Sequence, residues 1–278
     1  MSDSFFVVDA FTDRPFAGNP AAVCLLAQDR DDWWLQNVAR EMNHSETAFL
    51  RGGPRTWRLR WFTPTIEVAL CGHATLASAH AIWEAGLAEP GAPLSFSTKS
   101  GELSAGGRPG AITLDFPAEP AVPEPPHPGL LEALGIASAR FTGRNRFDAL
   151  VEIGSEDELR ALSPDFRALA VATRPDRGAI VTARSASPAF DFVSRFFAPA
   201  AGIDEDPVTG SAHCALAPYW AGRLGKTSLT GFQASARGGT VGVRVESNGR
   251  VTLSGAAVTI SRGELVGTRT AAPQRPAA

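Results

Sequence analysis

The chain has 278 residues, of which 44% are hydrophobic and 20% are charged, and its formal net charge is −3. This composition is typical of a globular protein, and the lack of a basic run argues against a protein that binds nucleic-acid phosphates. No apolar run reaches the roughly 20 residues that span a bilayer, and the polar, acidic N-terminus is unlike a secretory signal, so we expect no membrane partner.

Apolar patterns in the first half predict strands and two helices. The expected strands are residues 5–11, 21–26, 47–50, 56–62, 94–98 and 111–116, and the expected helices are 31–42 and 72–86. Turn-forming residues fill 12–20, and a glycine-rich turn is expected between the last two strands. The helix at 72–86 is rich in small apolar residues, so we expect it to be central in its part of the fold.

The second half begins after a proline-rich segment. Residues 117–128 hold six prolines, which excludes a helix or a central strand and predicts a crossover. The expected helices are 129–134, 156–162 and 209–224, and the expected strands are 147–153, 178–183, 190–197, 232–235, 240–245 and 250–260. The last ten residues are expected to form a loose tail.

Two parts of the chain resemble each other. Residues 72–79 (GHATLASA) align without gaps with residues 210–217 (GSAHCALA), and residues 60–64 (RWFTP) resemble residues 195–199 (RFFAP). We interpret this as an internal duplication of a strand, a loop and a helix. A chain of this length suits two lobes, and a cleft between related lobes is a common place for a binding site.

The second copy carries an acidic loop just before its helix. Residues 204–206 are Asp-Glu-Asp, and Thr209, Gly210 and Ser211 then open the helix. A helix start offers unpaired N–H groups and the positive end of the helix dipole, so acid/base side chains beside it indicate a site. The alternative is that Asp206 or Thr209 merely caps the helix.

Glu46 and His73 are the candidate groups of the first copy. Glu46 follows a helix break, where partial burial would raise its pKa and suit it to proton transfer; the alternative is an ordinary surface glutamate. His73 follows Gly72 at the helix start and suits anion binding or proton relay; the alternative is a packing histidine. His44 and His213 are possible supporting groups.

The cysteines and the remaining motifs narrow the chemistry. Three cysteines, an odd and widely spaced set, predict a reducing cytoplasm rather than a disulfide framework. Cys71 aligns with Thr209, so a two-thiol racemase is not supported, and we interpret Cys71 as a packing residue. His73 and His80 share a helix face without a suitably spaced third ligand, so no metal is expected. No nucleotide-binding glycine motif or hydrolase Gly-x-Ser-x-Gly is present, and we expect no cofactor.

Several segments together resemble the PhzF-like family, named after phenazine biosynthesis. They are residues 8–12 (VDAFT), 15–23 (PFAGNPAAV), 45–49 (SETAF), 60–64 (RWFTP), 71–75 (CGHAT) and 197–213 (FAPAAGIDEDPVTGSAH). In this order, the segments are distributed over most of the chain.

The resemblance implies the diaminopimelate epimerase-like fold, which is α+β. Two pseudo-symmetric lobes each consist of a mostly antiparallel sheet wrapped around a central helix. We expect residues 1–116 to form the first lobe, completed by residues 263–278, and residues 117–262 to form the second. The resemblance also implies a homodimer.

The same resemblance implies a cofactor-independent isomerase that transfers a proton on a small carboxylate-bearing metabolite. It implies that Glu46 is the general acid/base and that His73 and Asp206 assist it. The expected substrate-binding residues are Ser45, Gly72, Gly210 and Ser211, with the substrate carboxylate at the two helix starts. Residues 233–239 (QASARGG) resemble general family members more than the phenazine enzyme itself, so the substrate stays unassigned.

Two other functions remain open at this point. One is a non-catalytic protein that binds a small carboxylate in the same cleft. The other is an amino-acid epimerase or racemase, which the missing second thiol weakens.

Overall fold

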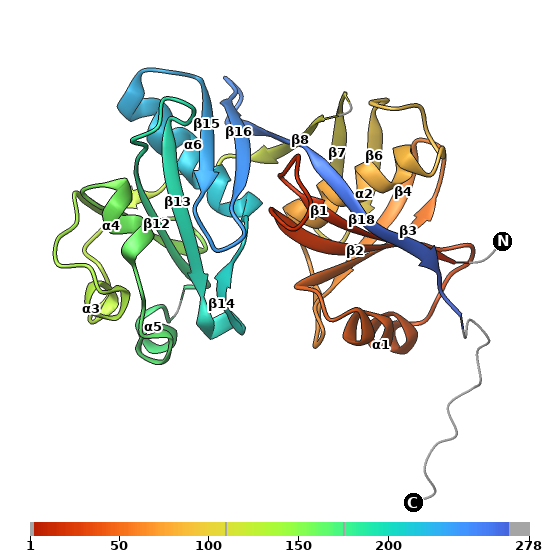
Figure 1. Ribbon diagram of the computed structural model, residues 1–278, viewed down its shortest axis with the longest axis horizontal. Coiled ribbons are helices and arrows are strands. Elements are labelled where there is room, and N and C mark those ends of the chain that lie inside the picture. Colours follow the sequence, from red (N-terminus) through yellow and green to blue (C-terminus); the bar gives the residue numbers. More distant parts are fainter. Residues whose placement is uncertain (1–2, 109, 175, 267–278) are drawn as a thin grey trace, which may run out of the picture.

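The computed structural model describes residues 3–108, 110–174 and 176–266. Figure 1 shows two lobes side by side, each with a curved sheet around one long helix. The fold is therefore α+β with two related lobes, as the sequence predicted. Within the described part of the chain, no helix is both long and apolar enough to cross a membrane.

The first lobe contains most of the N-terminal half. Its elements are β1 (Ser4–Ala10), β2 (Asn19–Leu25), α1 (Asp32–Met42), β3 (Glu46–Gly52), β4 (Thr56–Phe62), β5 (Glu67–Val68), α2 (Gly72–Glu84), β6 (Leu94–Thr98), β7 (Gly101–Arg108) and β8 (Ala111–Pro117).

The second lobe follows the proline-rich segment. Its elements are β9 (Val122–Pro123), α3 (Leu130–Leu134), β10 (Phe141–Arg144), β11 (Asp148–Glu152), α4 (Glu156–Ala161), α5 (Phe166–Ala172), β12 (Gly178–Arg184), β13 (Phe192–Ala198), the 3-10 turn η1 (Pro199–Ala201), β14 (Ile203–Asp206), α6 (Gly210–Leu224), β15 (Ser228–Gln233), β16 (Gly239–Val245) and β17 (Arg250–Gly255). The final strand, β18 (Ala257–Glu264), returns to the first lobe and pairs with β1.

The strand order repeats from one lobe to the other. The series β1-β2-β3-β4-β6-β7-β8 has the same pairing directions as β10-β11-β12-β13-β15-β16-β17. In each series the second pairing and the fourth pairing are parallel: β2–β3 and β4–β6, and β11–β12 and β13–β15. The two sheets join where β8 pairs with β17. The duplication seen in the sequence is therefore a duplication of the fold.

The same ion pair occurs in both copies. Arg60 at the end of β4 binds Glu67 through two hydrogen bonds of 2.7 and 2.8 Å. Arg195 at the equivalent place on β13 binds Glu205 through bonds of 2.7 and 2.9 Å. A two-pronged arginine–carboxylate contact fixes direction as well as distance. In each lobe it ties the strand to the loop that leads to the central helix.

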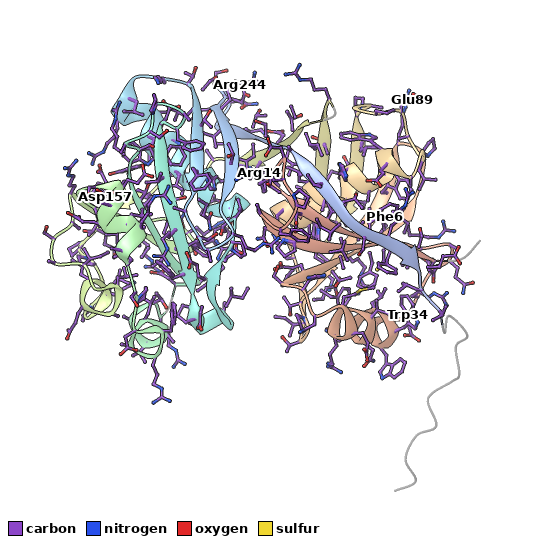
Figure 2. The ribbon with its side chains drawn as sticks, viewed as in Figure 1. Phe6, Arg14, Trp34, Glu89, Asp157 and Arg244 are labelled. Carbon is purple, nitrogen blue, oxygen red and sulfur yellow. The ribbon has the colours of Figure 1, made fainter. Side chains whose placement is uncertain are left out.

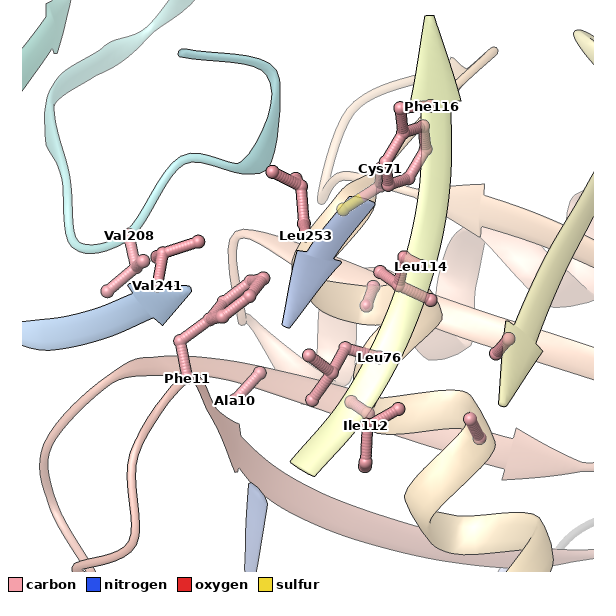
Figure 3. Packing of buried hydrophobic residues seen from close by; sticks show 14 of the residues in the cluster. Ala10, Phe11, Cys71, Leu76, Ile112, Leu114, Phe116, Val208, Val241 and Leu253 are labelled. Atoms are coloured by element: carbon pink, nitrogen blue, oxygen red, sulfur yellow. The ribbon is translucent and has the colours of Figure 1, made fainter. Parts of the chain in front are cut away.

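The first central helix is almost fully buried, and the N-terminal half of the second is buried as well. Ten of the thirteen residues of α2 are buried, because small and apolar side chains cover its whole circumference. One continuous apolar core surrounds α2 and α6 and crosses between the lobes. Figure 3 shows its crossing point, where Phe11 of the first lobe lies beside Val208, Val241 and Leu253 of the second.

Separate clusters cover the outer faces of the sheets. In the first lobe, α1 packs on the outside of its sheet, with Trp34, marked in Figure 2, edge-on to Phe49 at 6.3 Å. In the second lobe, α3, α4 and α5 cover the corresponding face. Each lobe therefore has helices on part of its outer face as well as a central helix inside.

A polar clamp also joins the lobes. Arg237, in the loop before β16, donates to Asp9 at 2.6 Å and to the carbonyl oxygens of Ala17 and Gly18. Asp9 is 2% exposed. Because breaking a buried ion pair leaves an unpaired charge, this contact resists separation of the lobes.

Some elements differ from the prediction. The glycine-rich turn before residue 111 is strand β7, and β10 and α5 were not predicted. The single strand expected at 250–260 is two strands, because the chain leaves β8 after Gly255 and joins β1 from Ala257. The expected lobe boundary at residues 262 and 263 therefore falls inside β18. The expected loose tail lies outside the described residues.

The crossing core generates a prediction about stability. Leu253→Ala should lower the free energy of unfolding by about 2–5 kcal/mol. The reason is that Leu253 is fully buried, so its truncation leaves a cavity in the core. Urea unfolding followed by circular dichroism measures this change. Val171→Ala, at a 69% exposed position, is the control and should change it by less than about 0.5 kcal/mol. Equal effects of both substitutions would contradict the prediction.

Candidate active site

Glu46 and His73 meet where β3 and α2 begin. Glu46 is the first residue of β3, and His73 lies in the first turn of α2. Glu46 Oε2 is 3.3 Å from His73 Nε2, and their side chains are only 14% and 6% exposed. Ser45 Oγ lies 3.5 Å from the same nitrogen. The structure therefore brings three of the expected residues into one cluster and largely encloses it.

Burial changes the acidity of Glu46. Loss of hydration raises the pKa of the Glu46 carboxyl group above its ordinary value, because the charged form is penalised. Hydrogen bonds from Ser45 and Cys71 and the positive charge of Arg177 offset part of this rise. A carboxyl group with a raised pKa takes up a proton more readily than a surface carboxylate and can release it again.

His73 is neutral under ordinary conditions. Burial lowers its pKa to about 4. Its Nδ1 lies 3.2 Å from the amide nitrogen of Asn19 and 3.5 Å from the thiol of Cys71. The Glu46 carboxylate oxygen, 3.3 Å from Nε2, is an acceptor and assigns the proton of the neutral ring to Nε2. His73 thus presents a hydrogen-bond donor to the Glu46 carboxylate.

Asn19 connects the two lobes at the site. It is the first residue of β2 and is completely buried. Its Nδ2 donates to Asp206 Oδ1 at 2.8 Å and to the Val208 carbonyl oxygen at 2.9 Å, both in the second lobe. The same nitrogen lies beside His73 in the first lobe. Asn19 therefore places Asp206 next to the Glu46–His73 pair.

Asp206 ends β14 and is 9% exposed. Its pKa is raised by burial and by the negative charge of Glu46, while His73 and hydrogen bonds from Thr209 and Asn19 oppose the rise. Asp206 is therefore close enough to Glu46 for the charge of Glu46 to affect its pKa. All three expected catalytic residues, Glu46, His73 and Asp206, are therefore close together.

The capping interpretation of the acidic loop is wrong. Thr209 precedes α6, but its side chain accepts no hydrogen bond from the first turn; its hydroxyl donates to Asp206. Gln233 accepts instead from the Thr209 amide at 2.9 Å and donates to the Asp206 carbonyl oxygen at 2.6 Å. Asp206 is free to face the site because Gln233 fixes the backbone around it.

The starts of α2 and α6 touch at two glycines. A Cβ atom on Gly72 would lie 3.4 Å from the Cα atom of Gly210, and the converse distance is also 3.4 Å. Neither helix has a side-chain cap at this end. Ser211, the next residue of α6, lies on the second-lobe side and accepts a hydrogen bond from Arg177 Nη2 at 2.9 Å.

Cys71 is buried next to two of the expected site residues, Glu46 and His73. Glu46, Cys71 and His73 each offer a ligand atom within 4.8 Å of the others, which is a donor set that suits a zinc ion if the thiol ionises. Burial and the charge of Glu46 hold the Cys71 pKa well above its ordinary value, so the thiol keeps its proton. The expectation of no metal stays a prediction, which metal analysis of the purified protein would test.

The other histidines take separate roles. His80 contacts Glu84 at 3.1 Å, away from His73. His213 is fully buried in α6, and its Nδ1 lies 2.9 Å from the Thr209 carbonyl oxygen, so it supports the helix start from inside. His44 is half-buried and feels the charges of Asp9 and Arg237.

The sequence did not predict Asn19, Gln233 or Arg177 as site residues. Asn19 stands between Gly18 and Pro20, where a turn explains an asparagine equally well. Gln233 and Arg177 lie at a strand end and before a strand, with no spacing signal. Their role depends on pairing between distant strands, which a single sequence does not display.

Known proteins resemble this chain over nearly its whole length. The family model described as phenazine biosynthesis-like protein, PhzC-PhzF, matches residues 8–263. An uncharacterized isomerase of Halalkalibacterium halodurans is 51% identical over 267 residues, which cover 96% of this chain and 99% of that protein. The crystal structure of a PhzF-family phenazine biosynthesis protein from Enterococcus faecalis matches with a TM-score of 0.89 and 40% identity, covering 95% and 99% of the two chains.

A more distant structure shares the fold alone. A probable proline racemase from Agrobacterium radiobacter matches with a TM-score of 0.65 and 13% identity, over 99% of this chain and 95% of that one. The family match, by contrast, combines sequence and structure. The chain therefore belongs to the PhzC-PhzF family of phenazine biosynthesis-like proteins, a family of isomerases.

Proposed function

We propose that this protein catalyses a cofactor-independent proton transfer of the allylic or keto–enol type on a small carboxylate-bearing metabolite. The reaction takes place at the junction of the two lobes. Glu46 is the general acid/base, and His73 and Asp206 assist it. The substrate itself stays unassigned.

The observation that carries the proposal is the state of Glu46. It is a nearly enclosed carboxyl group whose pKa is raised by burial, and it is 3.3 Å from a histidine that stays neutral. A structural ion pair would have a charged histidine, and a surface glutamate would have an ordinary pKa. A raised carboxyl pKa beside a hydrogen-bond donor is the arrangement expected of a group that moves protons.

The proposed reaction has two steps on one carboxyl group. The Glu46 carboxylate takes a proton from a carbon next to a carbonyl group or a double bond, and the electron pair of that C–H bond spreads over the conjugated system. The carboxylic acid then returns the proton to a second carbon of the same system. His73 Nε2–H can donate to the carboxylate before the first step and to a developing negative oxygen during it.

The two helix starts are one candidate contact for the substrate carboxylate. Backbone N–H groups at the beginning of a helix favour anions, and neither Cys71 nor Thr209 caps its helix with a side chain. Gly72 and Gly210 allow close backbone approach at this point. Ser45 and Ser211 are the hydroxyl groups proposed to contact the substrate.

The racemase alternative requires a second base on the opposite side. Cys71 and Thr209 occupy the two helix starts, and only Cys71 carries a thiol. The raised pKa of Cys71 keeps that thiol protonated, which disfavours it as a base. These observations favour a single shuttle carboxylate over a pair of thiols.

We expect the protein to exchange carbon-bound hydrogen of its substrate with solvent. It would be incubated in D2O with trans-2,3-dihydro-3-hydroxyanthranilate and a panel of small cyclic and amino-acid carboxylates, and mass spectrometry would count the deuterons gained. Glu46→Gln should lower the exchange rate by about 10²–10⁴-fold, because the amide cannot accept the proton.

Glu41→Gln on α1 is the matched control, since Glu41 is exposed and lies on the helix that packs on the outer face of the first sheet. It should exchange at the wild-type rate. An active Glu46→Gln protein would refute the assignment of the base. Exchange confined to the Cα position of amino acids would support the racemase, and binding of panel members without exchange would support a binding protein.

The exchange rate should also depend on pH through Glu46. The first step needs the carboxylate, and burial raises its pKa above the ordinary 4.5, so the rate should fall as the pH is lowered, and at a higher pH than for an exposed glutamate. His73, with a pKa of about 4, stays neutral over this range and should add no second inflection. Initial rates between about pH 5 and pH 8 test this, and a rate that increased on acidification would contradict it.

A further inference from the structure

The duplicated fold allows the two halves of the site to be compared position by position. In the first lobe, Thr47 of β3 pairs with Phe62 of β4. In the second lobe, Ala179 of β12 pairs with Phe197 of β13. Phe62 and Phe197 occupy the same place in the repeated segments 60–64 and 195–199. Thr47 and Ala179 are therefore equivalent.

Two neighbouring positions follow from this register. One residue back, Gly178 is equivalent to Glu46. Two residues back, Arg177 is equivalent to Ser45. The second lobe thus places an arginine where the first lobe has the serine beside its acid/base.

The central helices show the same equivalence. The alignment of Gly72 with Gly210 makes Ser211 the counterpart of His73. Ser45 Oγ lies 3.5 Å from His73 Nε2, and Arg177 Nη2 donates to Ser211 Oγ at 2.9 Å. The two lobes therefore make a side-chain contact at equivalent positions. In the first lobe the partners are a serine and a histidine, and in the second they are an arginine and a serine.

The position equivalent to Glu46 in the second lobe carries no acid/base side chain. A Cβ atom on Gly178 would lie 2.4 Å from the carbonyl oxygen of Phe197, so the position equivalent to Glu46 cannot carry a side chain without moving the backbone. What this lobe presents instead is the positive charge of Arg177.

The Arg177 guanidinium group is fixed by contacts within the protein, but one of its nitrogens makes none of these hydrogen bonds. Its Nε donates to the buried Asp148 at 3.0 Å, and Nη2 contacts both Asp148 and Ser211. The guanidinium group also lies over the rings of Phe147 and Phe196, at 5.4 and 5.3 Å. Nη1 makes no hydrogen bond with any residue that the structure describes, and the side chain is 39% exposed. One nitrogen with two donors is therefore available to a ligand.

We propose that Arg177, with Ser211, binds the substrate carboxylate and so determines that this enzyme acts on anionic substrates. The proposal rests on the proposed function, because it assigns one part of the same substrate. The carboxylate would lie against the second lobe, and the carbon that loses its proton would face Glu46 in the first. Arg177 is near enough to Glu46 to affect it, since its positive charge lowers the pKa of Glu46.

The experiment compares carboxylates with their uncharged carboxamides. The probes are benzoate with benzamide, and pyrrole-2-carboxylate with pyrrole-2-carboxamide, and isothermal titration measures each Kd. The wild-type protein should bind at least one carboxylate about 10-fold or more tightly than its carboxamide. If neither pair shows such a preference, the proposal is wrong.

The variants remove the charge without leaving an unpaired partner. Arg177→Gln alone would strand the buried Asp148, so it is combined with Asp148→Asn. The double variant should bind carboxylate and carboxamide about equally. Asp148→Asn alone should keep or increase the preference, because Arg177 retains its charge. Arg184→Gln, at the exposed far end of β12, is the matched control and should keep the preference.

Two further measurements separate a binding role from a structural one. Circular dichroism checks folding, and if the double variant does not fold, Arg177→Lys decides, with a preference reduced severalfold because one ammonium group cannot span Asp148 and a ligand. Removing Arg177 should also move the acid limb of the exchange rate to higher pH, since its charge lowers the Glu46 pKa. A preference that survives loss of Arg177 would assign the carboxylate to the helix starts and overturn the proposal.

The two proposals can fail separately. If the wild-type protein exchanges deuterium and the double variant does so with the same KM, the arginine assignment is wrong and the proton-transfer function stands. If the double variant loses the carboxylate preference while the wild-type protein exchanges nothing, the arginine assignment stands and the proton-transfer function fails.

Discussion

The contact between Gly72 and Gly210 is the constraint on which the site depends. The two helix starts approach so closely that a Cβ atom on either glycine would lie 3.4 Å from the other's Cα atom. A Cβ atom at that distance would be in van der Waals contact with the opposite helix, so little space remains between the two helix starts. The residues next to these glycines, Cys71 and His73 in one lobe and Ser211 in the other, are brought to the same junction by this approach. Pairing of β8 with β17 and return of β18 to β1 hold this approach from outside.

Burial then gives these side chains their chemistry. At the junction, loss of hydration disfavours every charge: it raises the pKa of Glu46 and of Asp206 and lowers that of His73 to about 4. The same carboxyl groups on a surface would be permanently ionised and would have little tendency to carry a proton. Asn19 keeps the cluster together by donating across the junction, which places two mutually repelling carboxyl groups within one hydrogen-bonded network.

The sequence predicted the parts of this arrangement that depend on local pattern. The helix at 32–42, the strands at 56–62 and 94–98 and the two central helices lie where periodicity and composition put them, and the repeat anticipated the two-lobed fold. The role of Asp206 was open between a cap and a site residue, and the structure excludes the cap, because Gln233 from a distant strand makes the backbone contacts at the helix start. Asn19 and Arg177 could not be predicted, since their function comes from strand pairing and lobe contact rather than from neighbours in sequence.

The duplicated scaffold carries an unsymmetrical site, and the asymmetry has a mechanistic consequence. Glu46 has Gly178 as its counterpart, so the second lobe carries no acid/base at the position equivalent to Glu46. A proton taken by Glu46 can then be returned by Glu46 on the same side of the substrate, which suits a one-base isomerisation and not a two-base racemisation. With Arg177 as the carboxylate contact, substrate binding would also neutralise the charge that lowers the Glu46 pKa. The pKa of Glu46 would rise when the substrate is bound, which favours the uptake of the proton that the first step demands.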